Sequence, residues 1–238
     1  MEINIFEKIL TQYASNINIK LTKKEINMFY RYMELLLEWN KVMNLTAITD
    51  ENDVILKHFV DSISINKYLQ NKNKIIDIGT GAGFPGIPLK ILNQEKDFIL
   101  VDSLNKRINF LEEVKKQLAL NNLTLIHSRV EDLAKDNNYR ESANAVVSRA
   151  VANLRVLVEY MLPFIEKDGI CICMKGPNIE VELDEAKNAI EILGGKIESI
   201  ENLKLPENIE RNIVIIKKIK NTPDKYPRKA GIPAKQPL

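Results

Sequence analysis

One stretch of the sequence decides the fold: Asp77-Ile78-Gly79-Thr80-Gly81-Ala82-Gly83-Phe84. It begins within a short apolar run, residues 75–78, of the kind that forms a buried strand. Glycines placed directly after such a strand let the chain turn sharply and bring its backbone against a ligand at the N-terminus of the next helix. We therefore expect a strand, a ligand-binding turn and a helix here, with the ligand beyond the carboxyl end of the strand.

After residue 74 the chain alternates between short apolar runs and helix-like segments. Residues 106–120, for example, carry apolar side chains three or four positions apart, which is the spacing of one helix face. Strands that alternate with helices predict a parallel sheet covered on both faces. The last two runs have no helix between them and predict an antiparallel hairpin at the edge of the sheet. The strand-like runs are residues 75–78, 98–101, 123–126, 145–147, 170–174, 196–200 and 212–216.

The first third of the chain reads as helical. Thr22-Lys-Lys-Glu25 is a capping box, in which the hydroxyl and the carboxylate each satisfy an amide of the first turn. Apolar residues with the helical period follow it, and a further helix is predicted over residues 53–69. The predicted fold is α/β and Rossmann-like, with a mostly parallel seven-stranded sheet, helices on both faces and an N-terminal helical cap. The expected divisions are a cap over residues 1–70, a ligand-binding domain over 71–220 and a basic, proline-rich tail over 221–238.

The ligand of the glycine turn has two readings. The dinucleotide-binding motif is matched by Gly81, Gly83 and Gly86. In that motif, however, the first glycine follows the strand directly, and here that position is occupied by Gly79. Counted from Gly79, the pattern Asp-x-Gly-x-Gly-x-Gly resembles the first motif of Rossmann-like methyltransferases. The acidic Asp77 also suits the sulfonium and ammonium of S-adenosylmethionine better than it suits a diphosphate. S-adenosylmethionine is therefore the expected cofactor, and a nicotinamide cofactor of an oxidoreductase is the alternative.

Further acidic residues follow the next two strands. Asp102 ends the second run, where a carboxylate can accept hydrogen bonds from both ribose hydroxyls. Ser128-Arg129-Val130-Glu131-Asp132 follows the third run and is a further acidic point at a strand end, where methyltransferases of this architecture meet the adenine. Acidic residues at three successive strand ends are hard to explain as solvated charge. Each of them alone, however, can be explained as an ordinary acidic residue of a loop. We expect these positions to bind the cofactor.

The net charge of +2 conceals a division along the chain. Residues 217–238 hold seven basic residues and one acid, so this segment carries +6 and the preceding 216 residues carry −4. The same segment holds four of the nine prolines. A stiffened basic arm on a slightly acidic body fits contact with a polyanion. The alternative is a solvated, disordered terminus.

Several classes of protein are disfavoured by composition. No stretch approaches the roughly 20 uncharged apolar residues of a membrane helix, and the N-terminus lacks a secretory signal. We therefore expect a cytoplasmic protein without membrane contact. Cys171 and Cys173 would share one strand face, and we interpret them as small core residues rather than a disulfide or half a metal site. His58 and His127 stand far apart, so no metal is expected.

Motifs along most of the chain point to one family. They are Asn44-Leu-Thr46, His58-Phe-Val-Asp61-Ser62, residues 77–88, Asp102-Ser-Leu-Asn-Lys-Arg107, Ser128-Arg-Val-Glu131, Ser148-Arg-Ala150, Met174-Lys-Gly176 and the tail from Tyr226 to Leu238. With these motifs the chain resembles the bacterial RsmG family, also called GidB (glucose-inhibited division protein B). The resemblance runs from about Asn44 to the C-terminus, and the first 40 residues share only helical character.

The resemblance implies both an activity and a set of residues. The activity is transfer of a methyl group from S-adenosylmethionine to N7 of a guanine in 16S rRNA (guanine 527 in the family), within the small ribosomal subunit or its precursor. Gly79 and Phe84 would line the cofactor pocket, Val130 and Glu131 would contact the adenosine part of the cofactor, and Arg149 would border the pocket. Ordinary packing is the alternative for Phe84, and an ion pair with a strand-end carboxylate such as Asp77 is the alternative for Arg149. The expected cofactor-binding residues are Gly79, Gly81, Phe84, Asp102, Val130, Glu131 and Arg149.

The chemistry implied by this target needs no proton transfer. Guanine N7 has a free lone pair at the major-groove edge, so its methylation removes no proton, and we name no catalytic acid or base. After the fourth run stands Ser148-Arg149-Ala150-Val151, not the Asn/Asp-Pro-Pro-aromatic motif of amino-group methyltransferases. The tail cations are expected to contact phosphates. The substrate-side candidates are His58, Asp61, Lys175, Arg228 and Lys229.

Two other functions remain open at this point. A methyltransferase of a small molecule or a protein would share every cofactor residue without needing the basic tail. A non-catalytic RNA-binding protein would keep the fold without turnover. We expect the chain to act as a monomer.

Overall fold

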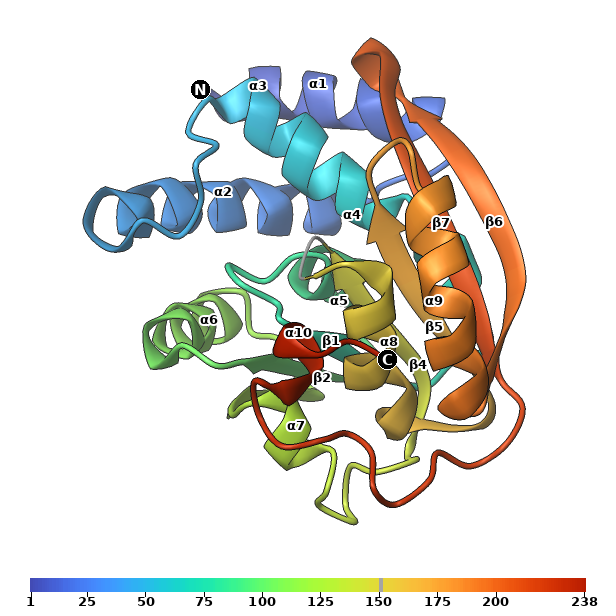
Figure 1. Ribbon diagram of the computed structural model, residues 1–238. Coiled ribbons are helices and arrows are strands. Elements are labelled where there is room, and N and C mark those ends of the chain that lie inside the picture. Colours follow the sequence, from blue (N-terminus) through green and yellow to red (C-terminus); the bar gives the residue numbers. More distant parts are fainter. Residues whose placement is uncertain (150–151) are drawn as a thin grey trace.

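The computed structural model describes residues 1–149 and 152–238 and contains one seven-stranded sheet between layers of helices (Figure 1). The strands are β1 Lys74–Ile78, β2 Asp97–Asp102, β3 Leu123–His127, β4 Ala143–Arg149, β5 Ile165–Lys175, β6 Gly195–Leu205 and β7 Ile209–Lys218. The N-terminal helices are α1 Ile3–Asn16, α2 Lys23–Met43, α3 Glu51–Asp53, the π-helix η1 Val54–Val60, α4 Asp61–Ile63 and the 3-10 helix η2 Asn66–Leu69. The later helices are α5 Gly86–Leu92, α6 Asn105–Gln117, α7 Val130–Leu133, α8 Leu154–Met161, η3 Leu162–Phe164, α9 Glu180–Ile192, η4 Pro206–Asn208 and α10 Ile232–Lys235.

The strand order is β3-β2-β1-β4-β5-β7-β6. The pairs from β3 to β5 are parallel, whereas β7 is antiparallel to both β5 and β6. The mostly parallel sheet and the closing hairpin are thus confirmed, with β7 inside the sheet and β6 at its edge. This order differs from the parallel 3-2-1-4-5-6 order of dinucleotide-binding folds. It reverses between β1 and β4, and ligands of such sheets bind in the crevice beyond the carboxyl ends at that point.

Each face of the sheet has its own core. Side chains alternate between the faces along a strand, so Ile75 of β1 joins one hydrophobic cluster and Ile76 the other. The first cluster contains residues of α5, α6 and the N-terminal helices, and the second contains residues of α7, α8 and α9. Cys171 and Cys173 are free and fully buried in the second cluster, which confirms their interpretation as core residues.

The N-terminal helices lie against the α5 and α6 side of the sheet (Figure 1). The predicted capping box is present at the start of α2, where the Thr22 hydroxyl and the Glu25 carboxylate both make their capping bonds. The single helix predicted over residues 53–69 is instead divided: helical turns continue to Ile63 with a π-helical stretch inside them, and a separate 3-10 turn follows. π-helical turns are rare and often occur at functional sites, and this one contains His58.

The C-terminal tail packs along the molecule and ends near α8 (red in Figure 1). Tyr226 is only 7% exposed, and Pro227 and Pro233 are buried. The guanidinium of Arg140 donates to the carbonyl oxygens of Thr222 and Tyr226 at 2.8 and 2.9 Å. The tail in this structure is therefore an ordered strap, which does not fit the alternative of a disordered terminus. Along the described residues, no helix has both the length and the apolar character needed to cross a membrane.

Candidate cofactor and substrate site

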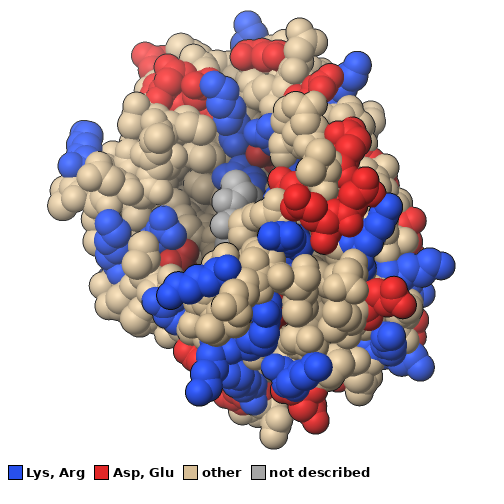
Figure 2. Space-filling model, viewed as in Figure 1, with Lys and Arg blue, Asp and Glu red and all other residues tan. Residues whose placement is uncertain are grey.

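A cavity of about 470 Å³ opens at the carboxyl ends of β1 to β4, where the strand order reverses. Figure 2 shows this face of the molecule hollowed, with Lys and Arg side chains around the hollow. Every residue predicted to bind the cofactor lines the cavity, and so does His58 of the substrate-side candidates. The other lining residues, which were not among the expected binding residues, are Leu45, Thr46, Ile78, Thr80, Ala82, Val101, Ser103, Arg107, Ser128, Arg129 and Tyr160.

The glycine turn forms one wall of the cavity. Gly79 and Gly81 have φ angles of +66° and +63°, in the left-handed region that other residues adopt only with strain. A Cβ atom added to Gly81 would meet no atom within 4 Å, so the space beside this backbone is open to a ligand. The turn thus presents bare backbone to the cavity, as the sequence predicted for a close approach to a ligand.

Asp77 lies beneath the turn and not in the cavity. It is fully buried, and its Oδ2 accepts hydrogen bonds from the Thr80 hydroxyl at 2.6 Å and the Gly86 amide at 2.8 Å. Its Oδ1 has no partner among the described residues. Burial raises the pKa of Asp77 to about 7, against the lowering effect of these hydrogen bonds. The sequence predicted that Asp77 would offer its charge to a cationic ligand. In the structure Asp77 does not line the cavity, and its carboxyl holds the turn together instead.

Asp102 also fixes the glycine turn. Its Oδ2 accepts from the Gly81 amide at 2.9 Å and its Oδ1 from the Leu104 amide at 2.9 Å. Arg107 pairs with the same carboxylate at 3.1 Å, and the Asp102 side chain is only 2% exposed. Both carboxylate oxygens are thus already engaged, and a ribose hydroxyl must share them or displace Arg107.

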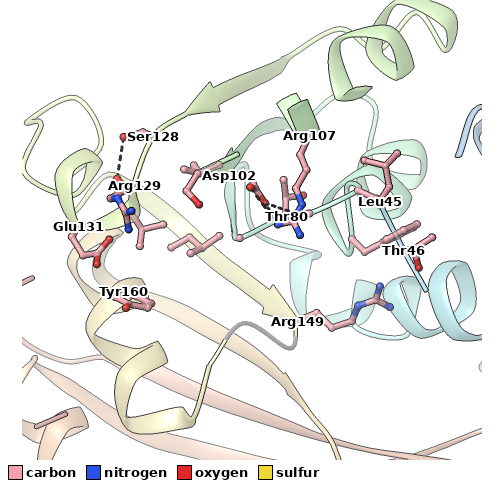
Figure 3. A pocket seen from close by; sticks show the side chains of 18 of the residues that line it. Leu45, Thr46, Thr80, Asp102, Arg107, Ser128, Arg129, Glu131, Arg149 and Tyr160 are labelled. Carbon is pink, nitrogen blue, oxygen red and sulfur yellow. Dashed lines mark hydrogen bonds and ion pairs between the residues drawn. The ribbon is translucent and has the colours of Figure 1, made fainter. Parts of the chain in front are cut away.

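One end of the cavity is rich in hydrogen-bond acceptors. Glu131 is 4% exposed, and its Oε1 accepts from the amide of Gly231 in the C-terminal tail at 3.0 Å. No hydrogen bond within residues 1–149 and 152–238 reaches its Oε2, which is therefore available to an amine donor. Tyr160 of α8 and Arg129 lie beside Glu131 (Figure 3). The tail thus completes the cavity wall beside Glu131, the residue that the sequence predicted to lie near the adenine.

The opposite end of the cavity is built around Arg149 (Figure 3). Its guanidinium pairs with Asp61 at 3.0 Å, donates to Nδ1 of His58 at 3.0 Å and lies 5.0 Å from the centre of the Phe84 ring. The His58 ring stacks on Phe84 at 4.3 Å with an interplanar angle of 11°. The carboxylate partner of Arg149 is therefore Asp61. The alternative drawn from the sequence, an ion pair with a strand-end carboxylate such as Asp77, is not the arrangement found.

Asp61 is a buried carboxylate with two arginine partners. The sequence marked it as a candidate site residue but did not predict these partners. It is 1% exposed and pairs with both Arg149 and Arg211, each at 3.0 Å. A buried carboxylate needs such partners, because an unpaired charge in the interior is costly. Asp61 does not line the cavity. Arg211 lies on β7, 150 residues away in sequence, and no sequence signal had connected it to the site.

Tyr32 of α2 is a second residue that sequence reasoning missed. It is fully buried, and its hydroxyl donates to the carbonyl oxygen of Ala82 inside the glycine turn at 2.5 Å. Its ring stacks on Phe59 at 5.4 Å and lies 5.5 Å from Phe84. A Cβ atom on Gly83 would lie 2.7 Å from the Tyr32 hydroxyl. The only available signal was its place on the apolar face of a predicted helix.

The other substrate-side candidates lie apart from the cavity. Lys175 is 10% exposed, donates to the carbonyl oxygen of Ala152 at 2.8 Å and pairs with Glu182 at 2.7 Å. Arg228 pairs with the fully buried Glu159 at 2.6 Å, which raises the pKa of Arg228. Lys229 is exposed.

Of the motif after β4, Ser148 and Arg149 are described, whereas Ala150 and Val151 lie outside the described residues. Metal-binding groups of three or more His, Cys, Asp or Glu are absent from the part of the chain that the structure covers.

The arrangement suits a ligand that is long and differs at its two ends. An amine donor fits the acceptor Glu131, an acceptor group fits the cationic Arg149, and bare backbone lies between them. The adenine amino group and the methionine carboxylate of S-adenosylmethionine have these characters. The residues present therefore fit this cofactor.

Solved structures share the fold. A ribosomal protein L11 methylase from Lactobacillus delbrueckii subsp. bulgaricus superposes with a TM-score of 0.53 and 16% identity, covering 69% of this chain and 79% of that one. TYW2 from M. jannaschii, solved in complex with AdoMet, superposes with a TM-score of 0.52 and 18% identity, covering 67% of this chain and 77% of that one. The chain therefore has the fold of class I S-adenosylmethionine-dependent methyltransferases.

Sequence comparison narrows the class to one family. The GidB family model, described as rRNA small subunit methyltransferase G, matches residues 25–214. A ribosomal RNA small subunit methyltransferase G from Clostridium tetani is 53% identical over 233 residues, covering 97% of this chain and 98% of that one. Another, from Lactococcus lactis subsp. lactis, is 49% identical over 236 residues, covering 98% of both. The chain belongs to the rRNA small subunit methyltransferase G family.

Proposed function

We propose that this protein transfers the methyl group of S-adenosylmethionine to N7 of a guanine in 16S rRNA. Membership of the family supports the RNA substrate, because its members carry the name of small-subunit rRNA methyltransferases. The observation that carries the cofactor is the polarity of the cavity, with the acceptor Glu131 at one end, the cation Arg149 at the other and the glycine turn between them.

The proposed cofactor contacts follow from this polarity. The backbone at Gly79 and Gly81 contacts the middle of the ligand, and Oε2 of Glu131 accepts from the adenine amino group. Val130 packs against the adenosine part. Asp102 contacts the ribose while keeping its bond to the Gly81 amide. When bound, S-adenosylmethionine supplies an electrophilic methyl group on its sulfonium.

The titratable groups of the cavity support a methyl acceptor atom that carries no proton, so that the reaction needs no base. His58 is the natural candidate for a base, but burial and the nearby Arg149 charge lower its pKa to about 3. Its Nδ1 also already accepts from Arg149. Asp102 is engaged by Arg107, and Glu131 lies at the far end of the cavity. Among the described residues, a free base is therefore lacking beside Arg149, in agreement with attack by the guanine N7 lone pair.

The surroundings of the cavity provide the other proposed roles. His58 and Asp61 position Arg149, and Lys175 holds the carbonyl oxygen of Ala152. Lys229 contacts RNA phosphates, whereas Arg228 anchors the tail. Residues 1–70 form a cap that supports the glycine turn, and residues 221–238 form a tail that supports the adenine end. We further propose that the protein acts as a monomer in the cytoplasm.

The test is methyl transfer from labelled S-adenosylmethionine to small ribosomal subunits from cells that lack this protein. Nucleoside analysis of the RNA should find the label in 7-methylguanosine at one site. Subunits from cells that contain the protein are the control and should accept little label. Cofactor binding without transfer to the subunit, its precursor or the free RNA would exclude this substrate and point to a small-molecule or protein acceptor.

A further inference from the structure

A chain of hydrogen bonds leads from the buried Asp61 to the hydroxyl of Thr46. Arg149 pairs with Oδ2 of Asp61 at 3.0 Å and contacts Nδ1 of His58 with its other terminal nitrogen at 3.0 Å. Nε2 of His58 lies 2.8 Å from Oγ1 of Thr46. The chain ends at the wall of the cavity, because Thr46 is half-buried and lines it.

The direction of each bond in this chain follows from the guanidinium. An arginine side chain has only donors and keeps its charge, so Nδ1 of His58 must accept. A neutral imidazole that accepts at Nδ1 carries its hydrogen on Nε2, and His58 therefore donates to Thr46. The low pKa of His58, about 3, is consistent with the neutral ring.

The oxygen of Thr46 is then fully used as an acceptor. It accepts from His58 at 2.8 Å and from the backbone amide of Ile48 at 3.1 Å, and a hydroxyl oxygen has two lone pairs. The hydroxyl hydrogen must point elsewhere, and within residues 1–149 and 152–238 no hydrogen bond takes it up. The Thr46 amide donates to Oδ1 of Asn40 at 2.9 Å, which fixes the residue in place. Thr46 thus offers a fixed hydrogen-bond donor at the cavity wall.

The charge of the same cluster calls for an anion. Asp61 carries one negative charge, whereas its two partners, Arg149 and Arg211, carry one positive charge each. His58 is neutral, so the cluster keeps a net positive charge. Thr46 and Arg149 lie together at this end, away from Glu131 (Figure 3). A fixed donor beside an excess positive charge suits a carboxylate.

We propose that the Thr46 hydroxyl donates a hydrogen bond to the methionine carboxylate of the cofactor. This assignment rests on the proposed cofactor direction, with adenine at Glu131. Thr46 and Arg149 together then form the carboxylate subsite, and the bonds from Asp61 through His58 fix the direction of the Thr46 hydrogen. O6 of the target guanine is another oxygen that such a donor could meet, and the experiment separates the two.

The experiment compares Thr46→Val, which is nearly isosteric but has no hydroxyl, with Thr46→Ser, which keeps it. Calorimetry measures binding of S-adenosylmethionine and of its decarboxylated analogue, which lacks the carboxylate. The loss of a hydrogen bond to a charged group should weaken binding of S-adenosylmethionine to Thr46→Val by roughly 10-fold or more. The decarboxylated analogue should bind wild type and Thr46→Val alike, and Thr46→Ser should bind S-adenosylmethionine like wild type.

Other outcomes overturn the proposal. Equal weakening for both ligands would mean that Thr46→Val deforms the pocket, and an unchanged affinity for S-adenosylmethionine would mean that Thr46 does not meet the carboxylate. Weaker binding of small-subunit RNA with unchanged cofactor affinity would assign the donor to the guanine. Thermal unfolding without ligand checks that both variants fold.

A spectroscopic measurement tests the hydrogen-bond chain without any ligand. The ¹⁵N chemical shifts of the His58 ring should show an unprotonated Nδ1 and a protonated Nε2 at neutral pH. The reverse tautomer would remove the basis of the proposal. Neither test needs methyl transfer, so failure of the RNA substrate leaves this inference intact. Failure of the wild type to bind S-adenosylmethionine would instead refute the cofactor assignment.

Discussion

The hydroxyl of Tyr32 donates a hydrogen bond to the carbonyl oxygen of Ala82 at 2.5 Å. The bond joins α2, in the N-terminal helices, to the middle of the glycine turn, 50 residues later in the chain. Both partners are buried, and among the described residues Tyr32 supplies the one hydrogen bond that reaches the Ala82 carbonyl oxygen. The N-terminal helices therefore help to set the backbone that meets the cofactor.

Replacing Tyr32 with Phe tests this connection. The Ala82 carbonyl would lose its donor in a buried place, which should lower the free energy of unfolding by about 1–3 kcal/mol. The turn should also loosen, so we expect severalfold weaker binding of S-adenosylhomocysteine, measured by calorimetry. Tyr30→Phe is the matched control, because the Tyr30 hydroxyl donates to the carbonyl of Met1 at 2.9 Å, away from the turn. Equal cofactor affinity in the two variants would show that Tyr32 supports the fold alone.

Gly79→Val should abolish cofactor binding. Gly79 has a φ of +66°, which a β-branched residue adopts only with strain, and the new side chain would enter the space between backbone and ligand. Gly176→Ala is the control, since a Cβ atom there meets nothing within 4 Å. Equilibrium binding of S-adenosylhomocysteine to both variants is the measurement. Near-normal affinity in Gly79→Val would mean that the cofactor pocket lies elsewhere.

The buried Asp77 should make stability fall as pH rises. Its pKa is raised from 3.8 to about 7 in the folded protein, so between these values the unfolded chain releases a proton that the folded chain keeps. Stability from this group is full below pH 3.8 and is lost as pH rises toward 7, by at most about 1.4 kcal/mol per pH unit. Asp77→Asn removes this term, so its stability relative to wild type should improve as pH rises.

Urea unfolding of wild type and Asp77→Asn at several pH values between 4 and 8 measures that difference. His58 acts in the opposite sense, because its pKa is lowered from 6.5 to about 3 and its contribution is lost as pH falls through that window. His58 is present in both proteins and so cancels in the comparison. The Asn amide also leaves a buried N–H without an acceptor, which costs the same at every pH. A difference that does not change with pH would contradict the raised pKa of Asp77.

The tail lysines should add to RNA affinity without adding to stability. Lys229 and Lys235 are exposed, and neither makes an ion pair within the described residues. The double variant Lys229→Ala, Lys235→Ala should bind small-subunit RNA more weakly. The slope of log affinity against log salt should also become shallower, by about 0.7–0.9 for each phosphate that the variant no longer neutralises. Lys20→Ala with Lys196→Ala is the matched control, because both lysines are exposed, lie outside the tail and make no ion pair with any other described residue. Equal slopes in the two variants would contradict a role for the tail in binding RNA.

Deletion of the whole tail is a poor substitute for these point variants. It would remove Arg228 and leave Glu159 as a buried carboxylate without its partner, a change that costs several kcal/mol. It would also free Oε1 of Glu131 from Gly231. Loss of RNA binding in such a deletion would therefore mix electrostatics with damage to the fold and to the cofactor wall.

Features that depend on neighbours in sequence were predicted well. The seven strands, the capping box at Thr22 and the glycine turn each follow from short-range patterns, namely apolar runs, a four-residue spacing and glycines after a strand. The antiparallel pairing of the last two strands followed from the missing helix between them. The position of β7 inside the sheet did not follow, because two apolar runs without a helix between them do not show which of the two pairs with β5.

The functional residues divide along the same line. The sequence by itself determined the α/β fold and the residues at the ends of β1 to β4, because parallel strands bring their carboxyl ends to one edge. Only the tertiary structure decided the partners of those residues: Arg211 on Asp61, Tyr32 on Ala82 and Gly231 on Glu131. These contacts join segments 50 to 150 residues apart. Such contacts arise because buried polar groups must find partners wherever packing brings the chain, and no local pattern records that outcome.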